Sequence, residues 1–201
     1  ATQLPLNERG VPLFDRFTQQ CGSSTLFMAG DASNDIPLLH EAADQGRIAG
    51  ENAARYPDVR SCLRRTPLSV VFTDPQVASA GFNLKQLNQH YAGRFAVGRV
   101  SFEDQGRSRV MLRTTGILKV YGEIGSGLFL GAEMFGPAAE HIAHLLAWSA
   151  QQRMTVAAML EMPFYHPVIE EGVRSALRDL GHQLQTGTAV FDRDLDCGPG
   201  A

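Results

Sequence analysis

A histidine followed by a proline and two glutamates lies near the end of the chain, in the segment FYHPVIEE, residues 164–171. An imidazole exchanges protons near neutral pH, and a carboxylate that accepts its Nδ1–H fixes the tautomer and stabilises the charged ring. Pro167 predicts the first position of a helix, so either Glu170 or Glu171 could supply that carboxylate for His166. The alternative interpretation is a helix-capping histidine beside two solvated glutamates.

A second candidate is Asp31, which follows Gly30 and the apolar run of residues 24–29. This run predicts a short buried strand, and a carboxylate at the C-terminal end of a strand can accept hydrogen bonds from ligand hydroxyl groups. The alternative is a turn aspartate that only stabilises a chain reversal.

A third candidate is the start of a helix predicted from Pro37 to about Tyr56, capped by Asn34 or Asp35. The N–H groups of its first turn, at Leu38, Leu39 and His40, and the positive end of its dipole suit a negatively charged ligand atom. Every helix has such an end, and His40 could equally be a surface or core histidine.

The composition of the chain excludes several classes of protein. Three cysteines, Cys21, Cys62 and Cys197, stand far apart among 201 residues, which argues against a disulfide framework, a zinc site and a redox Cys-x-x-Cys motif. The formal net charge is -3 without a basic run, and no apolar stretch can span a bilayer. We therefore expect a cytoplasmic protein that binds neither nucleic acid nor membrane, nor a metal.

The remaining elements are predicted from periodicity and turn residues, and they are strands first and helices afterwards. The predicted strands are residues 68–73, 77–81, 95–102, 110–113, 117–121 and 128–134, with a hairpin turn at residues 125–127. Asn83 and Thr155 are expected to cap short helices, Pro137 to begin a longer one and Pro167 to begin the last. This order predicts an α+β domain with an antiparallel sheet and helices on one side.

The polar stretch before Pro67 marks a domain boundary. We expect residues 1–60 to be the end of a preceding domain, residues 61–185 to be the α+β domain and residues 186–201 to be a loose tail. The first residues read as a continuation of a longer polypeptide.

Taken together and in order, these features resemble the C-terminal portion of the pyridine nucleotide–disulfide oxidoreductases, and most of all the dihydrolipoamide dehydrogenases. Four segments carry the resemblance: LFMAGD with PLLHEA (residues 26–31 and 37–42), VFTDPQVA (residues 71–78), GAEMFG (residues 131–136) and HPVIEE (residues 166–171). The resemblance implies the end of an FAD-binding domain followed by a dimerisation domain.

The resemblance also implies roles for individual residues. Asp31 would bind the ribityl chain of FAD, and the backbone of Leu38, Leu39 and His40 would meet the flavin pyrimidine edge. The family's His-Pro-Thr-x-x-Glu pattern selects Glu171 as the partner of His166, and the histidine acts as a base toward the disulfide site of the partner subunit. A homodimer, FAD, NAD and a dithiol or disulfide substrate such as lipoamide are therefore implied.

The sequence departs from the family in places. Val168 replaces the usual threonine and Phe164 stands where many lipoamide dehydrogenases have a histidine, which leaves the substrate open to another disulfide. No Gly-x-Gly-x-x-Gly opens a helix and no Cys-x-x-x-x-Cys is present. We expect these in an upstream part, so that this fragment alone would neither hold FAD tightly nor turn over. A purely structural dimerisation module is the remaining alternative.

Overall fold

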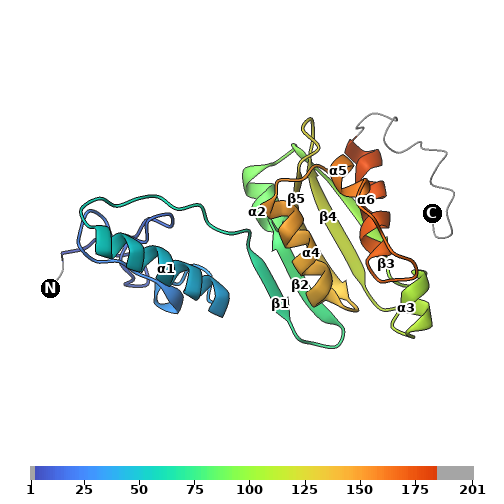
Figure 1. Cartoon of the computed structure of the whole chain (residues 1–201), viewed down its shortest axis with the longest axis horizontal. Coiled ribbons are helices and arrows are strands. Elements are labelled where there is room, and N and C mark those ends of the chain that lie inside the picture. The colour runs from blue at the N-terminus through green and yellow to red at the C-terminus, as the bar shows by residue number, and fades with distance from the viewer. Residues whose placement is uncertain (1–2, 185–201) are drawn as a thin grey trace. The chain divides into compact units, whose positions relative to one another are not determined.

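The computed structural model describes residues 3–184, so the predicted tail of residues 186–201 lies outside the described residues. The chain divides into two compact units, residues 1–65 and 66–201 (Figure 1). The sequence-based division at residue 60 differs from this one because Arg64 and Arg65 form ion pairs with Asp44, a residue of the first unit.

The second unit is built on a five-stranded antiparallel sheet with strand order β1-β2-β5-β4-β3 (Figure 1). Its strands are β1 (Leu68–Val71), β2 (Gln76–Gly81), β3 (Phe95–Ser101), β4 (Ile117–Glu123) and β5 (Phe129–Gly136). Neighbouring strands run antiparallel throughout, with a register shift between β4 and β5 at Tyr121 and Gly122. The predicted α+β architecture is confirmed.

Two helices cover one face of this sheet. α4 (Ala139–Gln151) packs on β2 and β5, and α6 (Glu171–Leu184) packs on β3 and β4. Alternate residues of the strands, among them Leu118 and Val120, point into this layer and are fully buried, as the period of two in a strand requires. The main hydrophobic core therefore lies between the sheet and these helices.

The opposite face of the sheet is covered at one end by α2 (Leu84–His90). Asn83 and Gln86 form the capping box at its start, as the sequence predicts for Asn83. Leu87 packs on Tyr121, and the carboxylate of Glu133 accepts hydrogen bonds from the Tyr121 hydroxyl and the Leu84 N–H. Burial and this hydrogen bond raise the pKa of Tyr121, so its phenol stays protonated in the folded protein.

The strand predicted at residues 110–113 is wrong. Residues Gly106–Val110 form the short helix α3 instead, because the Gln105 side chain accepts a hydrogen bond from Ser108 N–H and so caps a helical turn. The same side chain donates to the carbonyl of Val168, which links this helix to the loop before α6. Thr155 caps the short helix α5 (Val156–Leu160), as predicted.

The first unit contains the 3-10 turn η1 (Gly30–Ser33) and the helix α1 (Leu39–Arg55). The strand predicted at residues 24–29 is reduced to an isolated bridge between Gln20 and Phe27, because no regular strand in the described part of this unit pairs with it. The predicted capping is also wrong. Leu38 is the N-cap without a side-chain bond, and Asp35 forms an ion pair with Arg16 instead.

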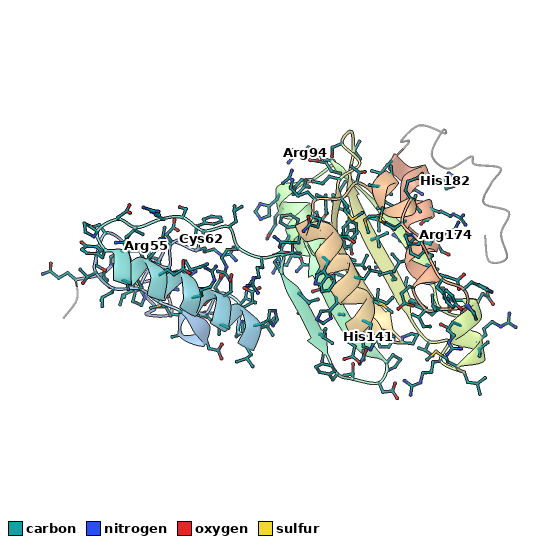
Figure 2. The ribbon with its side chains drawn as sticks, in the orientation of Figure 1. Arg55, Cys62, Arg94, His141, Arg174 and His182 are labelled. Carbon is teal, nitrogen blue, oxygen red and sulfur yellow. The ribbon has the colours of Figure 1, made fainter. Side chains whose placement is uncertain are left out.

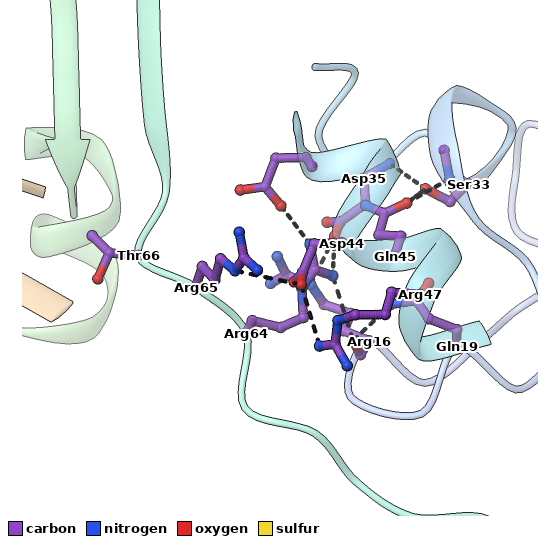
Figure 3. Close-up of polar contacts among 12 residues, drawn as sticks. Arg16, Gln19, Ser33, Asp35, Asp44, Gln45, Arg47, Arg64, Arg65 and Thr66 are labelled. Carbon is purple, nitrogen blue, oxygen red and sulfur yellow. Dashed lines mark hydrogen bonds and ion pairs between the residues drawn. The ribbon is translucent and has the colours of Figure 1, made fainter. Parts of the chain in front are cut away.

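Buried charges hold the end of this unit against α1. Arg64 is largely buried and forms ion pairs with Glu41 and Asp44, whose side chains are also buried (Figure 3). A buried carboxylate requires such a partner, because an isolated charge is strongly destabilised away from water. Asn52 also holds this segment, because its side chain donates a hydrogen bond to the carbonyl of Arg60 and accepts one from the N–H of Arg60.

The close approach of α6 to β3 depends on Gly98. A Cβ at this position would lie 2.2 Å from the carbonyl oxygen of Ala176 and 2.5 Å from Cβ of Leu180. We predict that Gly98→Ala lowers the free energy of unfolding by about 3 kcal/mol, measured by urea denaturation. Gly106→Ala is the control, since nothing lies within 4 Å of its added Cβ, and an equal loss in both variants would contradict this account.

Candidate active site

His166 and Glu171 lie at the junction between a turn and the last helix. The sequence-based helix start at Pro167 is wrong, because α6 begins at Glu171 and residues 166–170 form turns. One carboxylate oxygen of Glu171 accepts a hydrogen bond from Val168 N–H at 3.1 Å. The carboxylate therefore closes the turn whose first residue is His166, and it stabilises the positive end of the helix.

The other oxygen of Glu171 contacts the histidine. Nδ1 of His166 lies 2.9 Å from Oε1 of Glu171, a hydrogen-bond distance. The sequence left Glu170 and Glu171 as alternatives on spacing alone, and the structure pairs Glu171. The side chain of His166 is 50% exposed and that of Glu171 only 16%, so the imidazole is accessible while its partner is held. With Nδ1 directed at the carboxylate, Nε2 lies on the opposite side of the ring.

An apolar cavity of about 370 Å³ adjoins this loop. It lies between α4, α5 and α6, and its lining includes Leu145, Met162, Phe164, Tyr165, Val168 and Glu170. Tyr165 is 79% exposed at its rim. Tyr165 and Val168 thus face an apolar hollow, while His166 and Pro167 between them do not line it.

The second group of predicted residues lies in the first unit. Asp31 is exposed in η1, and its carboxylate makes no hydrogen bond or ion pair within residues 3–184. The helix start predicted at Pro37 is wrong, because α1 begins at Leu39, and its N-cap residue Leu38 makes no side-chain cap bond. The N–H of Leu38 donates to the carbonyl of Ile36, so it is not one of the free N–H groups that the sequence predicts. Leu39 and His40 are exposed beside it. The Asp31 carboxylate can accept hydrogen bonds from ligand hydroxyl groups, and the uncapped N–H groups at the start of α1 can donate hydrogen bonds to ligand oxygens. A flavin nucleotide has both kinds of group.

The exposed side of α1 includes a row of small residues beside the ion pair of Arg47 and Glu51. A Cβ added at Gly46 or Gly50 would meet nothing within 4 Å, and Ala43 is also exposed. The alanine and glycine content had indicated a close approach to a backbone or a flat ligand. That interpretation stays a prediction, because in the described residues this side of the helix is open.

Sequence reasoning missed one residue of this group. Gln45 is fully buried on α1, and its Oε1 accepts a hydrogen bond from Gly30 N–H at 2.7 Å. No motif or periodicity indicates the contact, since 15 residues separate the two positions. Its only sequence signal is a polar residue on the buried side of an amphipathic helix.

Other reactive side chains of the described residues are inert or isolated. Cys21 and Cys62 are free thiols, and burial raises the pKa of Cys21, which keeps its thiolate scarce. No group of three or more potential metal ligands occurs within residues 3–184. His141 and His144 lie on α4, where His144 Nδ1 contacts the carbonyl of Glu140. No helix in this part of the chain has the length and apolarity to cross a membrane.

Comparison with known proteins assigns the family. The sequence pattern described as "Pyridine nucleotide-disulphide oxidoreductase, dimerisation domain" matches residues 68–177, which include the whole sheet and the His166–Glu171 pair. The chain belongs to this family. The match covers more than half of the sequence, and the structure in this region is the antiparallel sheet with two covering helices.

Related proteins of known activity share its sequence at a moderate level. A dihydrolipoyl dehydrogenase of Haloferax volcanii is 29% identical over 80% of this chain and 34% of its own length. A mycothione reductase of Mycobacterium tuberculosis is 30% identical over 86% of this chain and 38% of its own. A mercuric reductase of Acidithiobacillus ferrooxidans is 27% identical over 88% and 31%, respectively. The chain thus spans about a third of the length of these family members.

Solved structures show the same fold. LpdA from Mycobacterium tuberculosis superposes with a TM-score of 0.73 at 22% identity, over 88% of this chain and 38% of that one. The HOCl-induced flavoprotein disulfide reductase RclA from Escherichia coli has a TM-score of 0.68 at 20% identity, over 88% and 39%. At these identities the likeness describes the fold of this family and not its substrate.

The double contact of Glu171 leads to a test of the local structure. We predict that Glu171→Ala lowers the free energy of unfolding by about 1–3 kcal/mol, because it removes two hydrogen bonds to a charged acceptor at once. The Nδ1–H signal of His166 in proton–nitrogen correlation spectra should also be lost. Glu170→Ala is the matched control, and a loss of that signal in the control would contradict the assignment of the pair.

Proposed function

We propose that this chain is the C-terminal part of an FAD-dependent dithiol/disulfide oxidoreductase, similar to dihydrolipoamide dehydrogenase, and that it supplies the acid–base pair and the dimer interface. The observation that carries the proposal is the 2.9 Å contact between His166 Nδ1 and Glu171 Oε1 on a half-exposed loop. A histidine held by a carboxylate and open on its other nitrogen is suited to proton transfer with a substrate.

In this proposal His166 acts on sulfur. Nε2 takes the proton from a substrate S–H group, because only the thiolate attacks a disulfide, and later returns a proton to the leaving thiolate. Glu171 holds Nδ1 protonated and stabilises the imidazolium that forms. Its second bond, to Val168 N–H, fixes the carboxylate itself, so the ring direction is set by the backbone of the same turn.

The first unit fits one end of FAD. The free carboxylate of Asp31 can accept hydrogen bonds from ribityl hydroxyls, and the uncapped N–H groups at Leu39 and His40 can face the pyrimidine edge of the flavin. When bound, FAD would pass electrons between the dithiol site and NAD. The redox cysteines and the remaining cofactor contacts belong, in this proposal, to an upstream part of the protein, and the fragment alone is inactive.

A homodimer is part of the mechanism, because the family places the histidine at the disulfide of the partner subunit. The exposed side of α4 supports this. Its exposed residues are His141 (Figure 2), His144, Leu145, Trp148 and Gln151. None of them is Asp, Glu, Lys or Arg, and Trp148 is 73% exposed. Interface cores are depleted in charge and enriched in aromatic residues, so this side of α4 suits a second copy of the chain.

The substrate is the finer part of the proposal. The relatives are named for dihydrolipoyl, mercuric and mycothione substrates, and Val168 and Phe164 depart from the lipoamide dehydrogenase pattern. Lipoamide is our first candidate and a glutathione-type disulfide the second, and rates of the complete protein with each distinguish them. Free thiols at Cys21 and Cys62 fit a reducing compartment, and a cytoplasmic location belongs to the same proposal.

Replacement of the base tests the catalytic role. We predict that His166→Ala in the complete protein lowers turnover at least about a hundredfold, because a general base contributes 10²- to 10⁴-fold. His90→Gln, which changes an exposed histidine on α2, should leave turnover unchanged. Unchanged turnover of the His166 variant, with the dimer intact, would favour the alternative of a purely structural dimerisation module.

The α4 surface has its own test. We predict that Trp148→Ala raises the dimer dissociation constant of the complete protein about thirtyfold, as truncation of an aromatic hot spot costs about 2 kcal/mol. Sedimentation equilibrium over a dilution series measures this constant. Ile117→Thr, on the other face of the sheet, is the control. An equal effect of both substitutions, or none of Trp148→Ala, would place the interface elsewhere.

A further inference from the structure

Gln45 connects the middle of α1 to both ends of η1. Its Oε1 accepts a hydrogen bond from Gly30 N–H at 2.7 Å and lies 3.3 Å from the Ser33 hydroxyl (Figure 3). Gly30 and Ser33 are the first and last residues of this turn, and Asp31 lies between them. One buried oxygen therefore anchors the short segment that carries the exposed Asp31 carboxylate.

The turn lies directly against the helix. A Cβ at Gly30 would be 3.5 Å from Cβ of Ala42, which stands one helical turn before Gln45. Gly30 has φ +73°, a left-handed conformation that glycine adopts without strain, and its N–H must point inward to reach Gln45. The direction of the Ala29–Gly30 peptide plane, at the start of the turn that carries Asp31, is thus set by a side chain of α1.

The remaining contacts hold the backbone of Asp31, whose carbonyl accepts a hydrogen bond from Asn34 N–H, but they leave its carboxylate unrestrained. The carboxylate has no hydrogen bond or ion pair within residues 3–184, and Ala29, before η1, makes no side-chain cap bond. Gln45 Nε2 is buried and also without a partner in this part of the chain. Within the described residues, the Gln45 amide therefore forms hydrogen bonds through its oxygen alone, and these bonds are to residues of η1.

We propose that Gln45 is a positioning residue, which aims the Asp31 carboxylate at the ribityl hydroxyls of FAD. The inference rests on the proposed function, because it assumes that Asp31 binds FAD. Loss of the acceptor leaves the partly buried Gly30 N–H without a protein partner, so the turn shifts to find another one and Asp31 moves with it. Gln45 affects FAD affinity only through Asp31.

A double-mutant cycle in the complete protein tests this. The dissociation constant of FAD is measured by flavin fluorescence during titration of the apoprotein, for Gln45→Met, Asp31→Asn and the double variant. Each single substitution should weaken FAD binding about five- to tenfold, as expected for loss of one hydrogen bond. The double variant should bind no more weakly than Asp31→Asn, because coupled residues are not additive.

If Gln45→Met does not fold, Gln45→Asn replaces it in the cycle. The Asn side chain is one methylene shorter, so its oxygen no longer reaches Gly30 N–H.

The outcomes separate the two hypotheses. If Gln45→Met weakens FAD binding equally in the native and Asp31→Asn backgrounds, Gln45 does not act through Asp31 and the inference fails. An unchanged affinity in Gln45→Met also overturns it. If Asp31→Asn leaves FAD binding unchanged, the assignment of Asp31 in the proposed function fails instead, and with it the premise of the inference.

Discussion

The carboxylate of Glu171 holds two groups of the same turn at once. Its oxygens bond the imidazole of His166 and the N–H of Val168, and it is the first residue of α6. The first bond directs the ring and the second keeps the carboxylate from rotating. Because α6 packs along β3 and β4, the sheet determines the position of this carboxylate. The candidate base is therefore held by a helix that packs on the sheet, although it lies in a loop itself.

The packing of α6 on the sheet is possible because of glycines rather than large side chains. At Gly98 and Gly122 the strands present no Cβ to the helix, so Leu180 and Leu184 lie close to their backbones. On the other side of the same sheet, Glu133 ties α2 to β4 and β5 through Leu84 and Tyr121. The sheet thus has helices fixed to both faces, by close backbone contact on one and by hydrogen bonds on the other.

Sequence patterns predicted those elements whose cause is local. Asn83 and Thr155 cap helices in the structure because their side chains reach N–H groups three residues along. The pattern failed where the cap is not one of the usual residues, Ser, Thr, Asp or Asn, and where a distant contact decides. Residues 106–110 are helical through Gln105, which also reaches Val168, and α6 begins at Glu171 rather than Pro167. His166 and Glu171 could be proposed as a pair from spacing and resemblance. The contact of Gln45 with Gly30 could not be predicted, because only the fold brings these two residues together.

The lack of charge on the exposed side of α4 has a consequence for how the protein responds to salt. Debye screening weakens attraction between opposite charges, but a contact made by Leu145 and Trp148 has none to screen. Sulfate and phosphate salts strengthen the burial of apolar surface, so an association through α4 should tighten as their concentration rises.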